Sequence, residues 1–294
     1  MRLKEAVKKI LGKSLLSIYH YKLALLGAFL YGFPGYRKNF KIIGVTGTSG
    51  KSTTCDLITR ILEEPFDSAQ GRSGNKVASI STIRFKIGEK EWENKYKMTM
   101  PGRFVIQKFL KQAKNAGCNF VVLEVTSEGI RQFRHKFINF DTAVFTNLSR
   151  EHIESHGSFE NYRNAKLELF KACKRNHIIN TDDENAKYFL SIPAIFNFQF
   201  SIERSAEQAT NKFSMPNFQT IRVKNVETNQ DGISFQISNF KFQIPLIGVF
   251  NVYNALAAIS VAKVYGINFE TCKKALEKAK GIAGRMEIIQ KEPF

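Results

Sequence analysis

The segment with the clearest chemical potential is GVTGTSGKSTT, Gly44 to Thr54, which follows the apolar run KIIGV. A glycine-rich turn between a strand and a helix lets backbone N–H groups surround phosphate oxygens, because glycine has no Cβ to block their approach. Gly47 and Gly50 would provide this access. Lys51 would reach the β- and γ-phosphates, and the Ser52 hydroxyl would ligate Mg²⁺. The segment therefore predicts a loop that binds nucleotide phosphates.

This loop departs from the strict phosphate-loop pattern G-x-x-x-x-G-K-[ST], which requires glycine where Val45 stands. Its glycines fall at positions 44, 47 and 50 instead. The alternative is a glycine-rich turn that binds no ligand. The apolar run before the loop, the helical pattern after it and the Lys-Ser pair all favour the phosphate-binding interpretation.

A parallel sheet is expected to position this loop, because apolar runs alternate with helical periodicity from Lys41 onward. We predict strands at 41–47, 76–82, 119–125, 141–147 and 177–180, and helices at 51–63, 103–116, 159–173 and 184–190. A polar loop at 65–75 and a hairpin turning at Gly88-Glu89 interrupt the alternation. After Ser191, short strands at 194–202, 220–228 and 233–246 predict a smaller β-rich portion, and helices at 252–265 and 269–279 follow. The predicted class is α/β, mostly parallel, with flanking helices.

Composition limits the compartment and the partners. The 294 residues suffice for one large α/β domain or two smaller ones. The four cysteines, Cys55, Cys118, Cys173 and Cys272, form no C-x-x-C pair, which fits a reducing, cytoplasmic compartment. The net charge of +18 is compatible with a nucleic acid, a membrane surface or an anionic substrate. No recognition motif or basic face with interleaved aromatics supports nucleic acid, so we expect none to bind.

Residues 1–40 read as a basic leader, since positions 1–41 carry nine Lys or Arg against the single acid Glu5. Apolar residues at helical spacing (Leu3, Val7, Ile10, Leu11, Leu15 and Ile18) predict a basic amphipathic helix. The following stretch LALLGAFLYGF has about half the apolar length that a membrane-spanning helix needs. No small-residue cleavage site follows it, which argues against a signal peptide. Residues 1–33 would either lie on the anionic inner membrane surface or pack on the neighbouring domain.

Several segments resemble one family. The loop TGTSGKSTT is similar to the TGTNGKTTT of the Mur ligases, the ATP-dependent amide-forming enzymes of peptidoglycan synthesis. Further segments resemble that family's motifs in the same order, namely TMPGRFVIQKFL, FVVLEVTSEGI, FDTAVFTNLSREHIESHGSFENYRNAKLELF, GVFNVYNALAAISVA and GRMEII. The resemblance is nearest to the UDP-N-acetylmuramoyl-tripeptide synthetases (MurE type). It covers about residues 41–290 and implies the family's Rossmann-like central ATP-binding domain.

The resemblance implies a magnesium site. Glu124 ends one predicted strand and His152 follows another, at the edge where open parallel sheets bind ligands. By resemblance both are Mg²⁺ ligands, together with Ser52. The family lysine that matches Lys166 is carbamylated by CO₂ and ligates a second Mg²⁺, which requires a neutral amine and thus a depressed pKa. Taken alone, His152 would be a surface or capping residue and Lys166 a solvated lysine.

The resemblance also assigns the remaining site residues. The ATP-binding set is Gly47, Thr48, Ser49, Gly50, Lys51, Ser52, Thr53, Asn251, Asn254 and Arg285, and the catalytic set is Lys51, His152 and Lys166. Asn251 and Asn254 share a face at the start of a helix, where helix capping is the alternative role. Thr99, Ser127 and Arg134 are assigned to the muramoyl-peptide substrate. Met100 and Glu128 replace a hydroxyl and an imidazole of the family pattern beside them.

The reaction implied is acyl activation. A substrate carboxylate attacks the γ-phosphate of ATP to give an acyl phosphate, and the amine of an amino acid then displaces phosphate to form an amide. The alternatives are an amide ligase like folylpolyglutamate or cyanophycin synthetase, and a membrane-associated nucleotide-binding scaffold. The family's N-terminal UDP-binding domain and C-terminal ligase domain have no counterpart in these residues. We therefore expect a fragment, or a chain that needs a partner, at the cytoplasmic face of the membrane.

Overall fold

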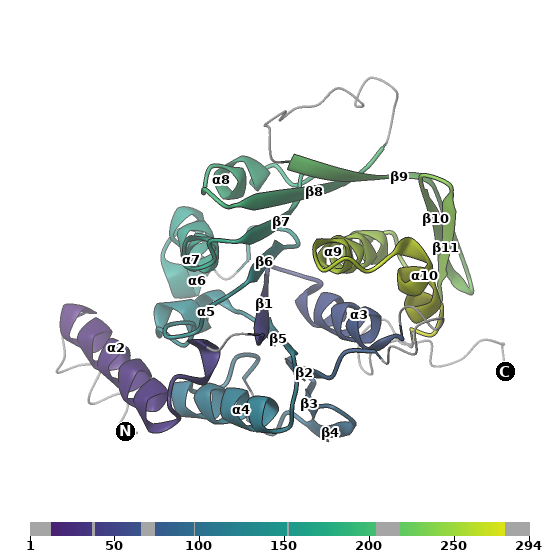
Figure 1. Cartoon of the computed structure of the whole chain (residues 1–294). Coiled ribbons are helices and arrows are strands. Elements are labelled where there is room, and N and C mark those ends of the chain that lie inside the picture. Colours follow the sequence, from purple (N-terminus) through teal and green to yellow (C-terminus); the bar gives the residue numbers. More distant parts are fainter. Residues whose placement is uncertain are drawn as a thin grey trace, which may run out of the picture.

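The computed structural model describes residues 13–36, 39–65, 74–96, 98–151, 153–203 and 218–279. Within these ranges an eleven-stranded sheet has the order β11-β10-β9-β8-β7-β6-β1-β5-β2-β3-β4 (Figure 1). Neighbouring strands from β9 to β2 pair in parallel, and antiparallel strands extend the sheet at both ends. The strands are β1 Lys41–Thr46, β2 Val77–Ile80, β3 Arg84–Ile87, β4 Lys90–Glu93, β5 Phe120–Glu124, β6 Thr142–Phe145, β7 Asn176–Asn180, β8 Phe196–Ile202, β9 Phe218–Asn229, β10 Gly232–Ile237 and β11 Phe240–Ile244.

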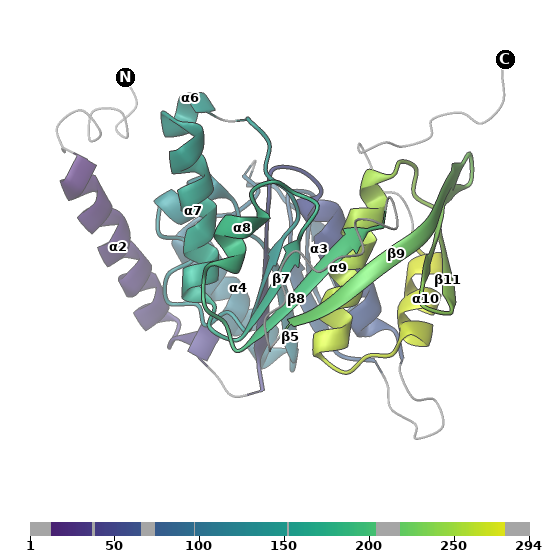
Figure 2. The same ribbon diagram turned by 90° about the horizontal axis from the view of Figure 1, so that it is seen from above.

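Helices cover both faces of the sheet, each over its own hydrophobic core (Figures 1 and 2). One face carries α3 Lys51–Glu63, α9 Phe250–Val264 and α10 Phe269–Glu277. The other carries α4 Arg103–Asn115, α5 Ser127–Arg131, α7 Phe159–Ala172 and α8 Ala186–Leu190. Helix α2, Lys13–Leu30, lies outside α4, and two short helices, η1 Pro34–Tyr36 and α6 Ile153–His156, complete the set. No helix in the described part of the chain is long and apolar enough to cross a bilayer.

The central strands are apolar throughout because both of their faces are covered. Every residue of β5 is buried, and β1 is buried from Ile42 to Thr46. Gly44 lets α7 approach closely, since a Cβ there would lie 2.9 Å from a Leu169 methyl carbon. The sequence run KIIGV therefore specifies a strand that sits in the middle of the sheet and leads into the loop at Gly47.

The predicted α/β class is confirmed, and each strand and helix predicted from Lys41 onward has a counterpart. The β-rich portion continues the same sheet, with β8 and β9 parallel to β7 and with β10 and β11 curving around α10 (Figure 1). Helices α5 and α6 were not predicted, because five and four residues are too few to show a period. In the leader, α2 runs unbroken from Lys13 to Leu30 and ends within the apolar stretch, while residues 1–12 lie outside the described ranges.

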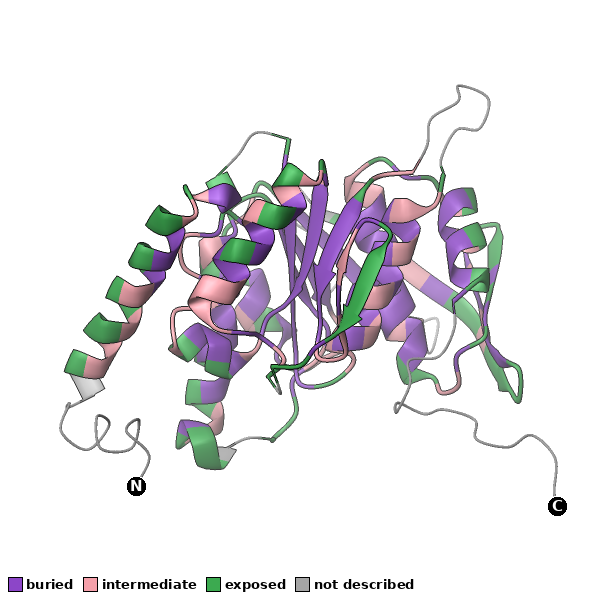
Figure 3. Cartoon of the chain, turned by 90° about the horizontal axis from the view of Figure 1, so that it is seen from below, coloured by how far each residue is buried: buried purple, intermediate pink, exposed green. Residues whose placement is uncertain are grey.

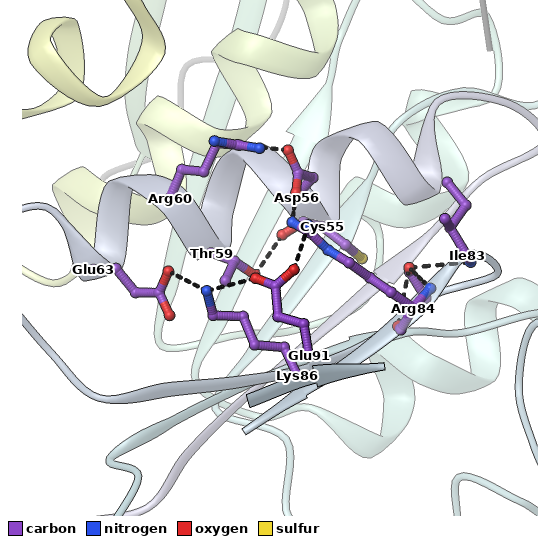
Figure 4. A network of polar contacts seen from close by, with 10 residues as sticks. Cys55, Asp56, Thr59, Arg60, Glu63, Ile83, Arg84, Lys86 and Glu91 are labelled. Atoms are coloured by element: carbon purple, nitrogen blue, oxygen red, sulfur yellow. Dashed lines mark hydrogen bonds and ion pairs between the residues drawn. The ribbon is translucent and has the colours of Figure 1, made fainter. Parts of the chain in front are cut away.

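An ionic network joins the β3–β4 hairpin to α3 (Figure 4). It consists of Asp56 with Arg60 and Arg84, Glu91 with Arg84 and Lys86, and Lys86 with Glu63. The Asp56–Arg60 distance is 2.7 Å, and the Glu91 oxygens lie 2.8 Å from Arg84 and from Lys86. Since Arg84 begins β3, these pairs fix the segment just before it, which contains Thr82.

Candidate active site

The loop from Gly47 to Gly50 connects β1 to α3 and requires glycine at both ends. Gly50 has φ 79°, a left-handed conformation that strains other residues. A Cβ at Gly50 would lie 2.2 Å from the Asn254 side-chain oxygen, and one at Gly47 would lie 1.9 Å from the Thr146 hydroxyl. The loop is therefore enclosed by β6 and α9 as well as by its own helix.

Hydrogen bonds fix the loop to the residues that follow β6. Asn147 accepts the Thr48 N–H through its backbone oxygen at 2.9 Å and the Ser49 N–H through its side chain at 2.9 Å. The Thr146 hydroxyl donates to the Ser49 carbonyl at 2.9 Å. Lys51 folds back over the loop, with its Nζ 2.6 Å from the Thr48 carbonyl oxygen. The Lys51 ammonium thus lies over the loop, and a lysine at this position of a phosphate loop would reach the β- and γ-phosphates.

Glu124 and Ser52 form a buried oxygen pair beside the loop. Glu124 ends β5, the strand next to β1, and each residue is 2% exposed. Glu124 Oε2 accepts from the Ser52 hydroxyl at 2.8 Å, from the Thr82 N–H at 2.8 Å and from the Thr82 hydroxyl at 3.0 Å. All three bonds reach the same oxygen, and no described residue donates to Oε1. A carboxylate with one oxygen left over and a hydroxyl fit Mg²⁺, which takes hard oxygen ligands.

Lys166 is a buried amine beside the loop. Its side chain is 1% exposed on α7, and its Nζ donates to the Gly47 carbonyl at 2.6 Å and lies 4.5 Å from the Tyr162 ring centroid. Burial, together with repulsion from Lys51, lowers the pKa of Lys166 well below its ordinary value. A lowered pKa favours the neutral amine, which is the form that reacts with CO₂. In the ranges that the structure describes, no three His, Cys, Asp or Glu side chains are grouped to hold a metal.

A cavity of about 260 Å³ opens beside the loop on the side of α9. Its lining is Ser49, Gly50, Asn147, Asn180, Asp182, Asp183, Phe250, Tyr253 and Asn254. The Tyr253 hydroxyl donates to Asp182 at 2.9 Å. Aromatic and acidic groups next to a phosphate loop are suited to a nucleoside, since the ring can stack and the carboxylates can accept from ribose hydroxyls.

Asn251 and Asn254 are buried and bonded to each other rather than capping α9. The Asn254 amide donates to Asn251 Oδ1 at 2.8 Å, and the Thr54 hydroxyl donates to Asn254 at 3.2 Å. Val249 is the N-cap residue of α9, and no side chain caps it. The capping alternative is therefore wrong. Asn254 reaches the cavity wall and Asn251 supports it from behind.

Each of the three predicted substrate residues has a hydrogen-bond partner among the described residues. The Thr99 hydroxyl lies 3.0 Å from the Thr82 hydroxyl, and Arg134 donates to the carbonyl of Met100, the residue after Thr99. The Ser127 hydroxyl lies 3.0 Å from His156 Nε2. Thr82 thus bridges the predicted metal ligand and the predicted substrate segment. His152 and Arg285 lie outside the described residues.

Sequence reasoning missed Thr82, Asn147, His156 and Asp182. Thr82 and Asn147 carried a usable signal, because each stands at the carboxyl end of a predicted strand, as Glu124 does. His156 and Asp182 carried none, since their partners are set by how α6 and α9 pack.

The sequence model of the Mur ligase middle domain matches residues 45–262, most of the chain. The chain belongs to the Mur ligase family. A UDP-N-acetylmuramyl-tripeptide synthetase of Roseiflexus sp. (strain RS-1) is 34% identical over 291 residues, covering 92% of this chain and 53% of that protein. The prediction of this family, nearest its tripeptide-synthetase branch, is thus confirmed.

Solved structures agree with this placement among the Mur ligases. A UDP-N-acetylmuramoyl-L-alanyl-D-glutamate–2,6-diaminopimelate ligase superimposes with a TM-score of 0.67 at 27% identity, covering 86% of this chain and 49% of that one. The apo form of L. casei FPGS gives a TM-score of 0.67 over 96% of this chain and 75% of that one, but at 15% identity it shows a shared fold alone. The chain spans about half the length of the Mur ligases it matches.

Proposed function

We propose that this chain carries the ATP-binding and acyl-activating half of a cytoplasmic ligase that joins an amino acid to a UDP-linked muramoyl peptide. The observation that supports this most directly is the arrangement of Ser52, Glu124 and Lys166 around one phosphate loop. A hydroxyl and a carboxylate meet there within 2.8 Å, and a buried amine with a lowered pKa lies against the same loop. The relatives' names supply the substrate class.

Each residue has a separate task in this proposal. The amides of Gly50 to Thr53 and the Lys51 ammonium hold the ATP phosphates, while Asn251, Asn254 and Arg285 serve the nucleoside end; the Thr48 and Ser49 amides instead fix the loop to Asn147. Ser52, Glu124, His152 and carbamylated Lys166 would ligate Mg²⁺, which when bound neutralises charge that develops on the transferring phosphoryl group. Thr99, Ser127 and Arg134 orient the muramoyl peptide so that its carboxylate faces the γ-phosphate.

Nucleotide binding tests the phosphate loop directly. We expect the purified chain to bind a fluorescent ATP analogue only with Mg²⁺ present. Lys51→Ala should weaken this affinity by about tenfold or more, because a charge-assisted contact to phosphate is lost. Lys108→Gln, which removes one exposed charge from α4, is the matched control. Magnesium-independent binding, or equal affinities for the Lys51 and Lys108 variants, would contradict the proposal.

Carbamylation of Lys166 has its own measurement. With ¹³C-labelled bicarbonate, ¹³C NMR should show one carbamate resonance that is absent in Lys166→Met. The signal should strengthen as pH rises, since more of the amine is then neutral. A resonance that persists in Lys166→Met would assign the carbamate to another amine.

We also propose that α2 rests on the anionic inner face of the membrane. Its outward side carries Leu15, Ile18, Leu25, Leu26, Phe29 and Leu30, which are 41% to 69% exposed (Figure 3). Ala24, Gly27 and Ala28 face α4 and are buried. In the sequence, nine Lys or Arg stand at positions 1–41, the stretch that contains this apolar face, and a basic amphipathic segment is attracted to anionic lipid.

Vesicle co-sedimentation tests the membrane contact. We expect the chain to bind vesicles with phosphatidylglycerol and to leave neutral phosphatidylcholine vesicles unbound. Leu26→Ser with Phe29→Ser should abolish the binding, whereas Ile195→Ser, which alters an equally exposed apolar residue on another surface, should not. Equal binding to both kinds of vesicle would remove this proposal and leave the ligase assignment untouched.

A further inference from the structure

Two arginines lie together at the junction of α2, α4 and α5, on the predicted substrate side. Arg103 begins α4 and donates through Nε and Nη2 to the Gln132 carbonyl, at 2.9 and 2.7 Å. Arg134 donates through Nη2 to the side-chain oxygen of the same Gln132 at 2.8 Å. One glutamine thus connects both guanidinium groups.

In the part of the chain that the structure describes, these two cations have only neutral hydrogen-bond acceptors. Besides Gln132, Arg103 contacts the His20 ring, and Arg134 contacts the Met100 carbonyl and the Met98 sulfur. Among the described residues, no carboxylate oxygen lies within 4.0 Å of either guanidinium. Glu128, on the same loop, is bonded to Gln132 and paired with Arg131 instead. The Arg134 Nε is buried and has no partner.

The two guanidinium groups lie close enough for one to affect the pKa of the other. Burial and repulsion from Arg134 lower the pKa of Arg103, and burial lowers the pKa of Arg134, which Glu128 partly offsets. Two guanidinium groups held together without a counter-ion are unfavourable in the free chain. An oxyanion placed between them would offset the repulsion and accept from N–H groups that the described residues leave unused, such as Arg103 Nη1 and Arg134 Nε.

Helix α2 fixes this arrangement. His20 Nδ1 lies 2.6 Å from Arg103 Nη2, and because guanidinium can only donate, Nδ1 must be the acceptor. Tyr21 on the next position packs its ring on Phe133 and Phe137, with centroids 6.0 and 5.4 Å apart. Both phenylalanines have left-handed backbones, with φ of 56° and 60°, so the loop that presents Arg134 is strained and needs this support.

We propose that Arg103 and Arg134 form one oxyanion site for the substrate, and that α2 positions it through His20. The inference rests on the proposed function and adds to it a second arginine and a role for the leader helix. The anion is a phosphate of the nucleotide diphosphate or a carboxylate of the muramoyl peptide. Arg103 would bind it directly, and His20 is a positioning residue.

Calorimetric titration of the full chain distinguishes the two sources. UDP-N-acetylglucosamine, which has the diphosphate and no carboxylate, and N-acetylmuramoyl-L-alanyl-D-glutamate, which has carboxylates and no phosphate, serve as probes. A saturating non-hydrolysable ATP analogue with Mg²⁺ keeps both probes off the phosphate loop, and its own binding is recorded in the same samples. Arg103→Gln should weaken one probe by about tenfold or more, as expected for lost hydrogen bonds to a charged group.

Further variants separate direct binding from positioning. Arg103→Lys keeps the charge but loses the fork, so we expect an intermediate affinity. His20→Ala should weaken the same probe by a few-fold, and His20→Gln, which can still accept from Arg103, should restore it. Lys108→Gln, an exposed charge on α4, should leave the affinity unchanged.

The outcomes are distinct. Loss of the nucleotide-sugar probe in Arg103→Gln supports a diphosphate, and loss of the peptide probe supports a carboxylate. Affinities that do not depend on Arg103, equal losses in Arg103→Gln and Lys108→Gln, or no binding of either probe to the unmodified chain would overturn this proposal. Failure of the ATP analogue to bind would instead overturn the proposed function.

Discussion

The arginines of the ionic network on α3 and the two arginines at the junction of α2, α4 and α5 have opposite surroundings. In the network, Arg60 and Arg84 share the buried carboxylate of Asp56, and Arg84 also pairs with Glu91 at 2.8 Å (Figure 4). In the pair, Arg103 and Arg134 have no carboxylate within 4.0 Å among the residues that the structure describes. Both groups are partly buried, so solvent does not explain the difference.

The pKa shifts of basic residues in the two regions also have opposite directions. Burial alone would lower the pKa of Lys86, but its hydrogen bonds to Glu91 and Glu63 raise it. Burial and the neighbouring Arg134 instead lower the pKa of Arg103. Charges that are paired within the chain contribute to the stability of the fold, whereas partly buried charges without a counter-ion are candidates for ligand binding.

Asp56→Ala should have the largest effect on stability. The substitution leaves Arg60 without its carboxylate and Arg84 with Glu91 alone, and the Asp56 side chain is only 8% exposed. We expect the free energy of unfolding to fall by about 3 to 4 kcal/mol, as when one partner of a buried ion pair is removed. Urea unfolding measures it, with Asp231→Ala, an exposed aspartate of the β9–β10 turn, as control.

A loss no greater in Asp56→Ala than in Asp231→Ala would show that the network does not hold the hairpin. The contrast between the two regions would then fail, because the ion pairs of the network would add no measurable stability. If stability falls as expected, the affinity for the ATP analogue measured on the folded fraction should change little.

His135, which follows Arg134, is a third basic residue near the arginine pair, and its burial favours the neutral ring. Its ring is 2% exposed and neither nitrogen has a partner. Burial, with a smaller contribution from Lys136, lowers the pKa of His135 to about 4. The unfolded chain binds this proton near the ordinary pKa of about 6.5, so stability is complete above that pH and falls as pH drops towards 4.

Over that interval His135 should cost up to about 3 kcal/mol of the free energy of unfolding. The measurement is urea unfolding at a series of pH values from neutral to acid, for the unmodified chain and for His135→Phe. The slope against pH should be shallower in the variant. Parallel slopes would mean that the ring finds a proton acceptor as the chain acidifies.

The features that could be predicted from the sequence are those that depend on short segments. The phosphate loop, the strand that ends at Glu124 and the helix that buries Tyr162 and Phe170 beside Lys166 all follow from local pattern and resemblance. The contacts that complete the site are between distant segments. Arg103 and His20 are 83 residues apart, and the Thr82–Glu124 bond depends on how β2 sits beside β5. Apolar periodicity fixes which face of a helix is buried, but not which polar side chain meets it.

Arg103→Gln should have the smallest effect on stability, and an effect of the opposite sign to Asp56→Ala. The substitution removes the repulsion with Arg134, while the glutamine amide can still donate to the Gln132 carbonyl. We expect the free energy of unfolding to stay within about 1 kcal/mol of the unmodified chain, on the side of greater stability, because surface and half-buried charges contribute little.

Sulfate adds a second measurement. Bound between the two guanidinium groups, it should raise the melting temperature of the unmodified chain more than chloride at equal ionic strength, and this difference should disappear in Arg103→Gln. A marked loss of stability in this variant would show that Arg103 supports the fold as Arg84 does, and the two regions would no longer be opposites.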